Sequence, residues 1–93
     1  MVKVVFDFNH IPDLPAFYRA FSQNFALSED FGANLDALWD VVTGEIALPV
    51  EIEFVHFSRR HQRRFAAIVL LLEEAEEELA GRLHFNVVDE HIV

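Results

Sequence analysis

Three short β-rich segments, separated by longer helical patterns, constrain this chain more than any other feature of its sequence. β-Branched and aromatic residues predict strands at 2–8, 50–55 and 83–88. Between these segments, apolar residues recur at spacings of three and four, which predicts helices. Strands that alternate with helices join into parallel sheets through right-handed crossovers. We therefore expect an α/β fold with a three-stranded parallel sheet covered by helices.

The predicted helices carry start and stop signals. Asp13 and Asn34 have side chains that can cap the first two helices, and Gly44 is well placed to end the second. Ser58 can cap one long third helix, which residues 80–81 end. The apolar residues that should form the core stripes are Leu14, Phe17, Phe21 and Phe25 in the first helix, Leu35, Leu38, Trp39 and Val42 in the second, and Phe65, Ile68, Leu72, Ala75 and Leu79 in the third.

Length and composition indicate one domain spanning residues 1–93. An apolar share of 53%, with ten phenylalanines, is enough for a hydrophobic core and argues against disorder. The chain has no cysteine, which excludes disulfides and thiolate metal sites and fits a reducing compartment. Asp7 comes before a secretory signal can form, and the longest apolar run, residues 65–72, is far shorter than a membrane span. We expect a cytoplasmic protein.

The formal net charge of −9 bears on the class of partner. An acidic protein repels nucleic acid and anionic lipid, and it attracts basic proteins. Nucleases have basic active clefts because their substrate is a polyanion, so a small acidic protein can occupy such a cleft. The alternative is that the acidity serves solubility alone.

Asp36 and Asp40 lie four residues apart on the second predicted helix, with Trp39 beside the second carboxylate. Residues at this spacing share one helix face, and two like charges there cost an isolated helix a few tenths of a kcal/mol. A cation, a metal ion or a basic partner outside the helix would make the pair favourable. The alternative is two solvated surface acids, with Asp36 stabilised at the helix N-terminus.

The stretch around these two acids carries a family resemblance. Residues 31–40 read Phe-Gly-Ala-Asn-Leu-Asp-Ala-Leu-Trp-Asp, and Thr-Gly at 43–44 and Leu-Pro at 48–49 follow. This pattern resembles the barstar family of intracellular ribonuclease inhibitors, and the resemblance extends over nearly the whole chain. It implies a barstar-like fold and a protein that occludes the basic active site of a nuclease with an acidic helix and loop. It also implies that Asp36 and Asp40 are the central contacts.

The resemblance adds further partner-binding positions. Trp39 is either a core aromatic or a partly exposed anchor, and the resemblance favours the second role. Gly32 and Asn34 shape the loop that carries the contact surface, because glycine permits backbone conformations that other residues resist. Thr43 falls on the helix face of the two acids, and Glu74 matches an acidic contact on the last helix.

Two acids depart from the better-known barstar pattern. Asp30 stands where those inhibitors have a tyrosine, and Glu45 stands where they have a tryptophan. Two aromatic surface contacts are therefore replaced by carboxylates, which leaves the identity of the partner open. It is either a different, more basic nuclease or a basic partner that is not a nuclease.

The long third helix has one basic end and one acidic end, and both oppose the helix dipole. The basic end can pair with acids elsewhere in the fold or with the acidic end of a second molecule, so a homo-oligomer is one hypothesis. Leu70 lies well off the core stripe, which favours a second packed surface; a solvated charge run is the alternative. The charged residues are Arg59, Arg60, Arg63 and Arg64 at the start, and Glu73, Glu74, Glu76, Glu77 and Glu78 at the end.

The sequence carries no enzyme or cofactor motif. The five histidines lack metal-ligand spacing, although His84, Asp89 and His91 could converge near the C-terminus. With three glycines the chain has no glycine-rich phosphate loop, and its serines lack the context of a nucleophile elbow. Asp36 and Asp40 would need a cleft to act as a general acid–base pair. We expect no catalytic residue, metal or cofactor, and no enzyme activity.

Overall fold

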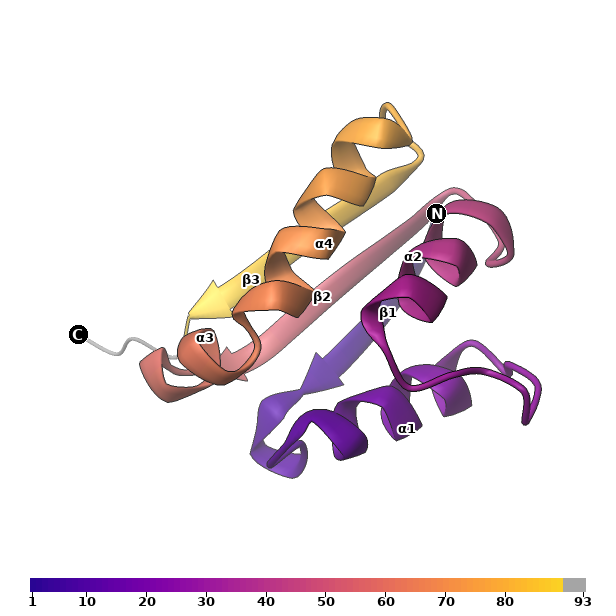
Figure 1. Ribbon diagram of the computed structural model, residues 1–93. Helices are drawn as coiled ribbons and strands as arrows, with labels where there is room; N and C mark the ends of the chain where they lie inside the picture. Colours follow the sequence, from indigo (N-terminus) through magenta and orange to yellow (C-terminus); the bar gives the residue numbers. More distant parts are fainter. Residues whose placement is uncertain (90–93) are drawn as a thin grey trace.

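The computed structural model describes residues 1–89, which form a three-stranded parallel sheet with helices packed on it (Figure 1). The strand order is β1-β2-β3, so β2 is central and the other two strands lie at the edges. The strands are β1 (Val2–Asp7), β2 (Val50–Phe57) and β3 (Leu83–Asp89). Val50 pairs with Val2 on one side and with Leu83 on the other. The predicted α/β architecture is confirmed.

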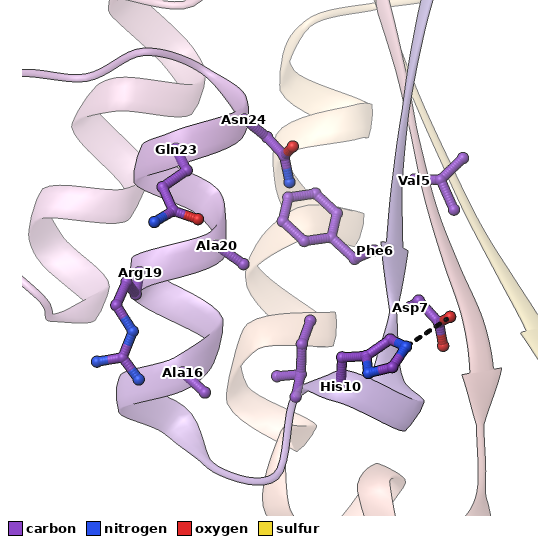
Figure 2. A pocket seen from close by; sticks show the side chains of 10 residues that line it. Val5, Phe6, Asp7, His10, Ala16, Arg19, Ala20, Gln23 and Asn24 are labelled. Carbon is purple, nitrogen blue, oxygen red and sulfur yellow. Dashed lines mark ion pairs between the residues drawn. The ribbon is translucent and has the colours of Figure 1, made fainter.

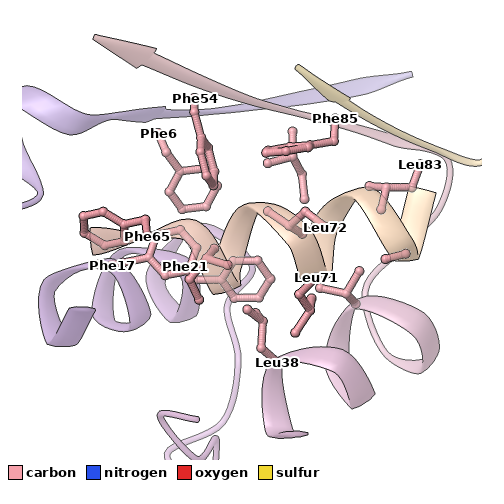
Figure 3. Close-up of a cluster of buried hydrophobic side chains, with 14 of the residues drawn as sticks. Phe6, Phe17, Phe21, Leu38, Phe54, Phe65, Leu71, Leu72, Leu83 and Phe85 are labelled. Atoms are coloured by element: carbon pink, nitrogen blue, oxygen red, sulfur yellow. The ribbon is translucent and has the colours of Figure 1, made fainter. Parts of the chain in front are cut away.

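Four α-helices and one 3-10 helix occur in the described part of the chain. They are η1 (Phe8–His10), α1 (Leu14–Asn24), α2 (Leu35–Gly44), α3 (Arg59–Arg64) and α4 (Ala66–Glu78). Helices α1, α2 and α4 lie on the same face of the sheet, and α2 packs beside α4 (Figures 1 and 3). All three predicted caps are confirmed: Asp13 Oδ1 accepts from the Ala16 N–H at 3.0 Å, Asn34 Oδ1 from the Ala37 N–H at 2.8 Å, and Ser58 Oγ from the His61 N–H at 3.4 Å.

Within residues 1–89 the helices cover one face of the sheet (Figure 1), which agrees with the predicted sheet covered by helices. Side chains of β2 alternate between buried and half-buried over 50–55. On the open face, Lys3 Nζ lies 3.2 Å from Glu53 Oε1, and Asn86 Nδ2 donates to Glu51 Oε2 at 2.7 Å. Parallel sheets are usually buried on both faces, and these polar cross-strand contacts let one face of this sheet meet water.

The prediction of one long helix after Ser58 is wrong, because α3 and α4 meet at a break. Phe65 leaves helical geometry at φ −109° and ψ 19°. Its ring is fully buried, with its centroid 5.0 Å from that of Phe8 and 6.2 Å from that of Phe17. The chain therefore turns at the residue whose ring enters the core, although no glycine or proline lies there.

Because of the break, two of the four arginines lie at the end of a helix and not near the start of a long one. Arg63 and Arg64 end α3, where the helix dipole favours cations, so the prediction that they oppose it is wrong. Arg64 Nη1 also donates to the Pro12 carbonyl at 2.9 Å. Arg59 and Arg60 lie in the first turn of α3 and do oppose the dipole, as do the glutamates that end α4.

Phenylalanines join the sheet to the helices in the core (Figure 3). Phe54 of the central strand has its ring centroid 5.7 Å from that of Phe6 and 4.9 Å from that of Phe85. Edge-on contacts of this kind add to the free energy of burial. The predicted stripe from Phe65 to Leu79 is buried throughout.

Leu14 and Leu35 were predicted to face the core, and both predictions are wrong. The two side chains are 38% and 41% exposed. Each is the first residue of its helix, at the margin of the apolar stripe, where the neighbouring elements do not cover it. Val41, outside the predicted stripe of α2, is buried instead.

Candidate protein-binding site

Helix α2 is a platform fixed to the core along one side. Leu38, Val41 and Val42 are buried, and they hold this side against α4 and the core. The Asn34 side chain caps the start of the helix, and the Glu45 N–H donates to the Val41 carbonyl at 2.9 Å where the helix ends. The opposite side of α2 is therefore presented to solvent with little freedom to move.

Asp36 and Asp40 occupy that opposite side. Both are exposed, and neither side chain makes a hydrogen bond or ion pair with any residue in 1–89. The structure thus brings the two carboxylates together on consecutive turns of one helix, as their spacing predicts. Their oxygens are free to accept hydrogen bonds from the cations of a partner.

Trp39 lies between the core and the surface. Its side chain is partly buried and packs against the hydrophobic core, and its carbonyl accepts a hydrogen bond from Thr43 Oγ1 at 2.7 Å. Trp39 therefore combines the two predicted roles: it is partly a core aromatic and partly exposed. Thr43 is half-buried, and its hydroxyl is engaged within the helix.

Gly32 occupies a tight space and has no unusual backbone conformation, which corrects the prediction from the sequence. The positive-φ residues are Ala26, His56, Ala80 and Gly81. A Cβ on Gly32 would meet Asn34 Nδ2 at 3.0 Å and Ala37 Cβ at 3.4 Å. The Gly32 carbonyl also accepts from the Asn34 N–H at 2.9 Å. Gly32 therefore fits closely around the cap that starts α2.

Asp30 and Glu45 extend the acidic surface beyond the two ends of α2. Asp30 is exposed in the preceding loop, where its N–H donates to Ser28 Oγ at 3.3 Å. Glu45 is exposed and follows the last residue of the helix. We refer to these two acids and the pair on the helix, namely Asp30, Asp36, Asp40 and Glu45, as the acidic strip.

Glu74 lies on α4, apart from the strip but on the side toward α2. Leu71 points from α4 toward Leu38 of α2 (Figure 3). Glu74 follows Leu71 by three residues and is exposed, so it flanks the seam between the two helices.

A hollow beside Asp36 was not anticipated from the sequence. It has a volume of about 580 Å³ and lies between the starts of α1 and α2, with apolar walls that include Leu14, Pro15 and Leu35. Burial raises the pKa of the Tyr18 hydroxyl, which lies in its wall. The signal in the sequence is a leucine at the first position of each helix, next to a cap residue.

A second hollow lies between β1 and α1 (Figure 2). Asp7 and His10 face each other in it, with Oδ2 and Nε2 3.8 Å apart, which is too far for a hydrogen bond. No serine, threonine or cysteine lines this hollow, which has a volume of about 330 Å³. The arrangement does not form a nucleophile–base pair.

The described residues hold no metal cluster. Within 1–89, no group of three or more His, Cys, Asp or Glu side chains is placed to bind a metal ion. His84 is exposed, and His91, the third member considered with Asp89, lies outside the described residues. None of the helices in 1–89 has the length and apolar character that a membrane crossing requires.

Comparison with known proteins identifies the family. The family described as Barstar (barnase inhibitor) matches residues 1–89. The chain belongs to the barstar family. A relative from Bacillus subtilis (strain 168), named "Putative ribonuclease inhibitor YrdF", is 30% identical over 82 residues, which cover 85% of this chain and 90% of the relative. Membership of the barstar family supports a barnase-inhibitor-like role and indicates an inhibitor, not an enzyme.

Proposed function

We propose that this barstar-family protein binds a basic ribonuclease and occludes its active site with α2 and the loop before it. One observation carries the proposal. Asp36 and Asp40 are exposed and make no contact with other charged groups of residues 1–89, on a helix that is capped at its start and packed on the core. Because α2 is already ordered, little conformational entropy is lost when a partner docks on it.

The two carboxylates would take the places of RNA phosphates. A nuclease cleft binds phosphates with arginine, lysine and histidine side chains. An arginine guanidinium binds a carboxylate through two parallel hydrogen bonds, as it binds a phosphate. Asp36 and Asp40, one turn apart, can engage two such cations at once.

The rest of the acidic strip would guide the encounter. Asp30 and Glu45 lie at the two ends of α2, and the whole chain has a formal charge of −9. Complementary charge raises association rates and falls off with salt. Two acids in place of family aromatics favour a target whose surface around the cleft is also basic.

The hollow between α1 and α2 would receive an apolar or aromatic side chain of the nuclease. Interface hot spots pair such anchors with pockets that exclude water. Leu14 and Leu35 supply the apolar wall, and Asp36 lies at its rim. The partly exposed Trp39 would add a second apolar contact, with Glu74 at the edge of the interface.

The proposal places the protein in the cytoplasm, in an immunity role. There it would shield RNA from a nuclease that the cell makes or meets. A folded inhibitor without cysteines does not depend on an oxidising compartment.

An RNA-cleavage assay tests the proposal. A barnase-type ribonuclease would be mixed with increasing amounts of the protein, of Asp40→Ala, and of Glu77→Ala as a matched control. Glu77 is an exposed carboxylate on α4 that lies off the acidic strip. We expect stoichiometric inhibition by the wild type and by Glu77→Ala, and at least about thirtyfold weaker inhibition by Asp40→Ala, because the partner cation is left unpaired.

Two results would contradict the proposal. Full inhibition by Asp40→Ala would show that α2 is not the contact. No inhibition by the wild-type chain of any basic ribonuclease tested would indicate a basic partner that is not a nuclease.

A further inference from the structure

The exposed side of α3 and α4 carries three zones in sequence: basic, apolar and acidic. Six residues define this α3–α4 ridge, at successive spacings of three, three, four, three and four. All six are exposed, and Leu70, at the middle, is 57% exposed. The ridge consists of Arg60, Arg63, Ala66, Leu70, Glu73 and Glu77.

The α4 part of the ridge lies directly opposite the buried side of the helix. Ile68, Leu72 and Ala75 face the core with no exposed surface. At 100° per residue, Leu70 and Glu77 fall on the far side of the helix from them. Helix α3 precedes α4 across the break at Phe65 (Figure 1), so the arginines lie before the start of α4 and the glutamates lie in its second half.

The charges of the ridge have no partners within the molecule. Among residues 1–89, no hydrogen bond or ion pair engages the side chains of Arg60, Arg63, Glu73 or Glu77. In contrast, Arg64 is bound to the Pro12 carbonyl. Glu73 and Glu77 are like charges one turn apart, which is unfavourable in an isolated helix. A partner of opposite charge order would relieve this repulsion at both ends.

We propose that a second copy of this chain covers the α3–α4 ridge, with the two α4 helices antiparallel across a two-fold axis near Leu70. Arg63 lies just before the start of α4 and Glu77 lies near its end, on either side of Leu70. A two-fold axis at Leu70 therefore brings the Arg63 end of each copy toward the Glu77 end of the other. A two-fold interface uses the same patch on both subunits, and residue pairs occur twice. Both ion pairs form in one closed dimer.

The apolar centre fits the same arrangement. The two Leu70 side chains meet at the axis and are removed from water together. Ala66 lies four residues before Leu70 and is exposed, so its small side chain leaves room for the facing helix to approach. The order of charges along the ridge, and not its apolar area, favours a second copy as the partner. A foreign protein would need basic, apolar and acidic zones in the reverse order to match the ridge.

The dimer surface is separate from the surface proposed for the nuclease. Glu74 lies on the flank of α4 toward α2, while Glu73 and Glu77 lie on the ridge. The inference therefore stands or falls independently of the ribonuclease. Variants of the ridge should change self-association and leave inhibition unchanged, and variants of Asp40 should do the reverse.

Sedimentation velocity over a range of micromolar to millimolar protein, at low salt, tests the proposal. We expect twice the monomer mass at high concentration. Arg63→Glu and Glu77→Arg should each weaken the dimer at least about tenfold by placing like charges together. The exchanged variant Arg63→Glu/Glu77→Arg should restore it. An equimolar mixture of the two single variants should form a heterodimer. Glu74→Arg, a matched change off the ridge, should have no effect.

Leu70→Asp is a further test that does not depend on the fold of α3, because Leu70 lies on α4. Circular dichroism would confirm that each variant is folded. This change should weaken the dimer as much as either charge variant. A monomer at every concentration would overturn the proposal. So would failure of the exchanged variant to dimerise, or masses that grow beyond two copies, which indicate a head-to-tail contact.

Discussion

Helix α2 and the α3–α4 ridge both present unpaired charges from a helix anchored to one core, yet they differ in sign pattern. The strip along α2 is acidic throughout, from Asp30 to Glu45. Such a surface repels a copy of itself and requires a foreign basic partner. The ridge carries both signs in an order that a two-fold axis reverses. The difference indicates that a single small domain can hold one surface for another protein and one for itself.

The two surfaces also differ in how the chain holds them. Helix α2 is fixed by a side-chain cap at Asn34 and by the close fit of Gly32. The ridge depends on the junction at Phe65, where a fully buried ring fixes how α3 meets α4. A local cap and core packing together position the first surface, and core packing at one junction positions the second.

The largest expected effect is a loss of stability of the whole domain, which would disturb both surfaces together. Phe65→Ala removes a buried ring from the core and should lower the free energy of unfolding by about 3–5 kcal/mol. Urea unfolding followed by circular dichroism measures this loss. Leu70→Ala, an exposed position on the next helix, should stay within about 0.5 kcal/mol of the wild type. Equal losses in the two variants would contradict the role given to Phe65.

The next largest effect concerns how Asp36 and Asp40 each contribute to nuclease binding. Asp36→Ala and Asp40→Ala should each weaken nuclease binding, with a coupling of about 0.5–3 kcal/mol between them if they engage neighbouring cations of one cleft. A double-mutant cycle by calorimetry measures the coupling. Strict additivity would mean that the two carboxylates contact unconnected parts of the partner.

A smaller effect concerns the local support of α2. Asn34→Ala removes the acceptor of the Ala37 N–H and should cost about 1 kcal/mol of stability. Thermal unfolding checks this value. Ser28→Ala is the control, since its hydroxyl accepts a longer bond, 3.3 Å, from a loop N–H. If the two changes cost the same, the cap does not have the importance assigned to it.

The smallest effect on stability is expected for a change in the wall of the hollow beside Asp36. Leu35→Ala should change the free energy of unfolding by less than about 0.5 kcal/mol, because the side chain is already exposed. Its effect on nuclease binding should be larger, about 1 kcal/mol, if a partner side chain enters the hollow. Comparing unfolding with calorimetric binding separates the two. A change in stability alone would assign Leu35 to packing.

The elements of the fold were predictable where periodicity and capping agree. The stripe from Phe65 to Leu79 and the caps Asp13 and Asn34 rest on local chemistry, and all of them are confirmed. Glu51 and Glu53 alternate with buried apolar residues along β2, so the strand presents one apolar face to the helices.

The remaining features depend on distant contacts. The break at Phe65 has no glycine or proline to signal it, and the Phe65 ring packs there against Phe8 and Phe17, which are distant in sequence. The exposure of Leu14 and Leu35 depends on what lies beside the helix starts, which periodicity does not report. The positions of Asp36 and Asp40 on one face followed from spacing, while their role as contacts stays a prediction from the family.

The most direct test of the account is a calorimetric titration of a barnase-type ribonuclease with the wild-type protein, Asp40→Ala and Glu77→Ala. The account predicts one-to-one binding by the wild type, unchanged affinity for Glu77→Ala, and a loss of at least about thirtyfold for Asp40→Ala. Equal affinity of the two variants would contradict the assignment of α2 to the foreign partner.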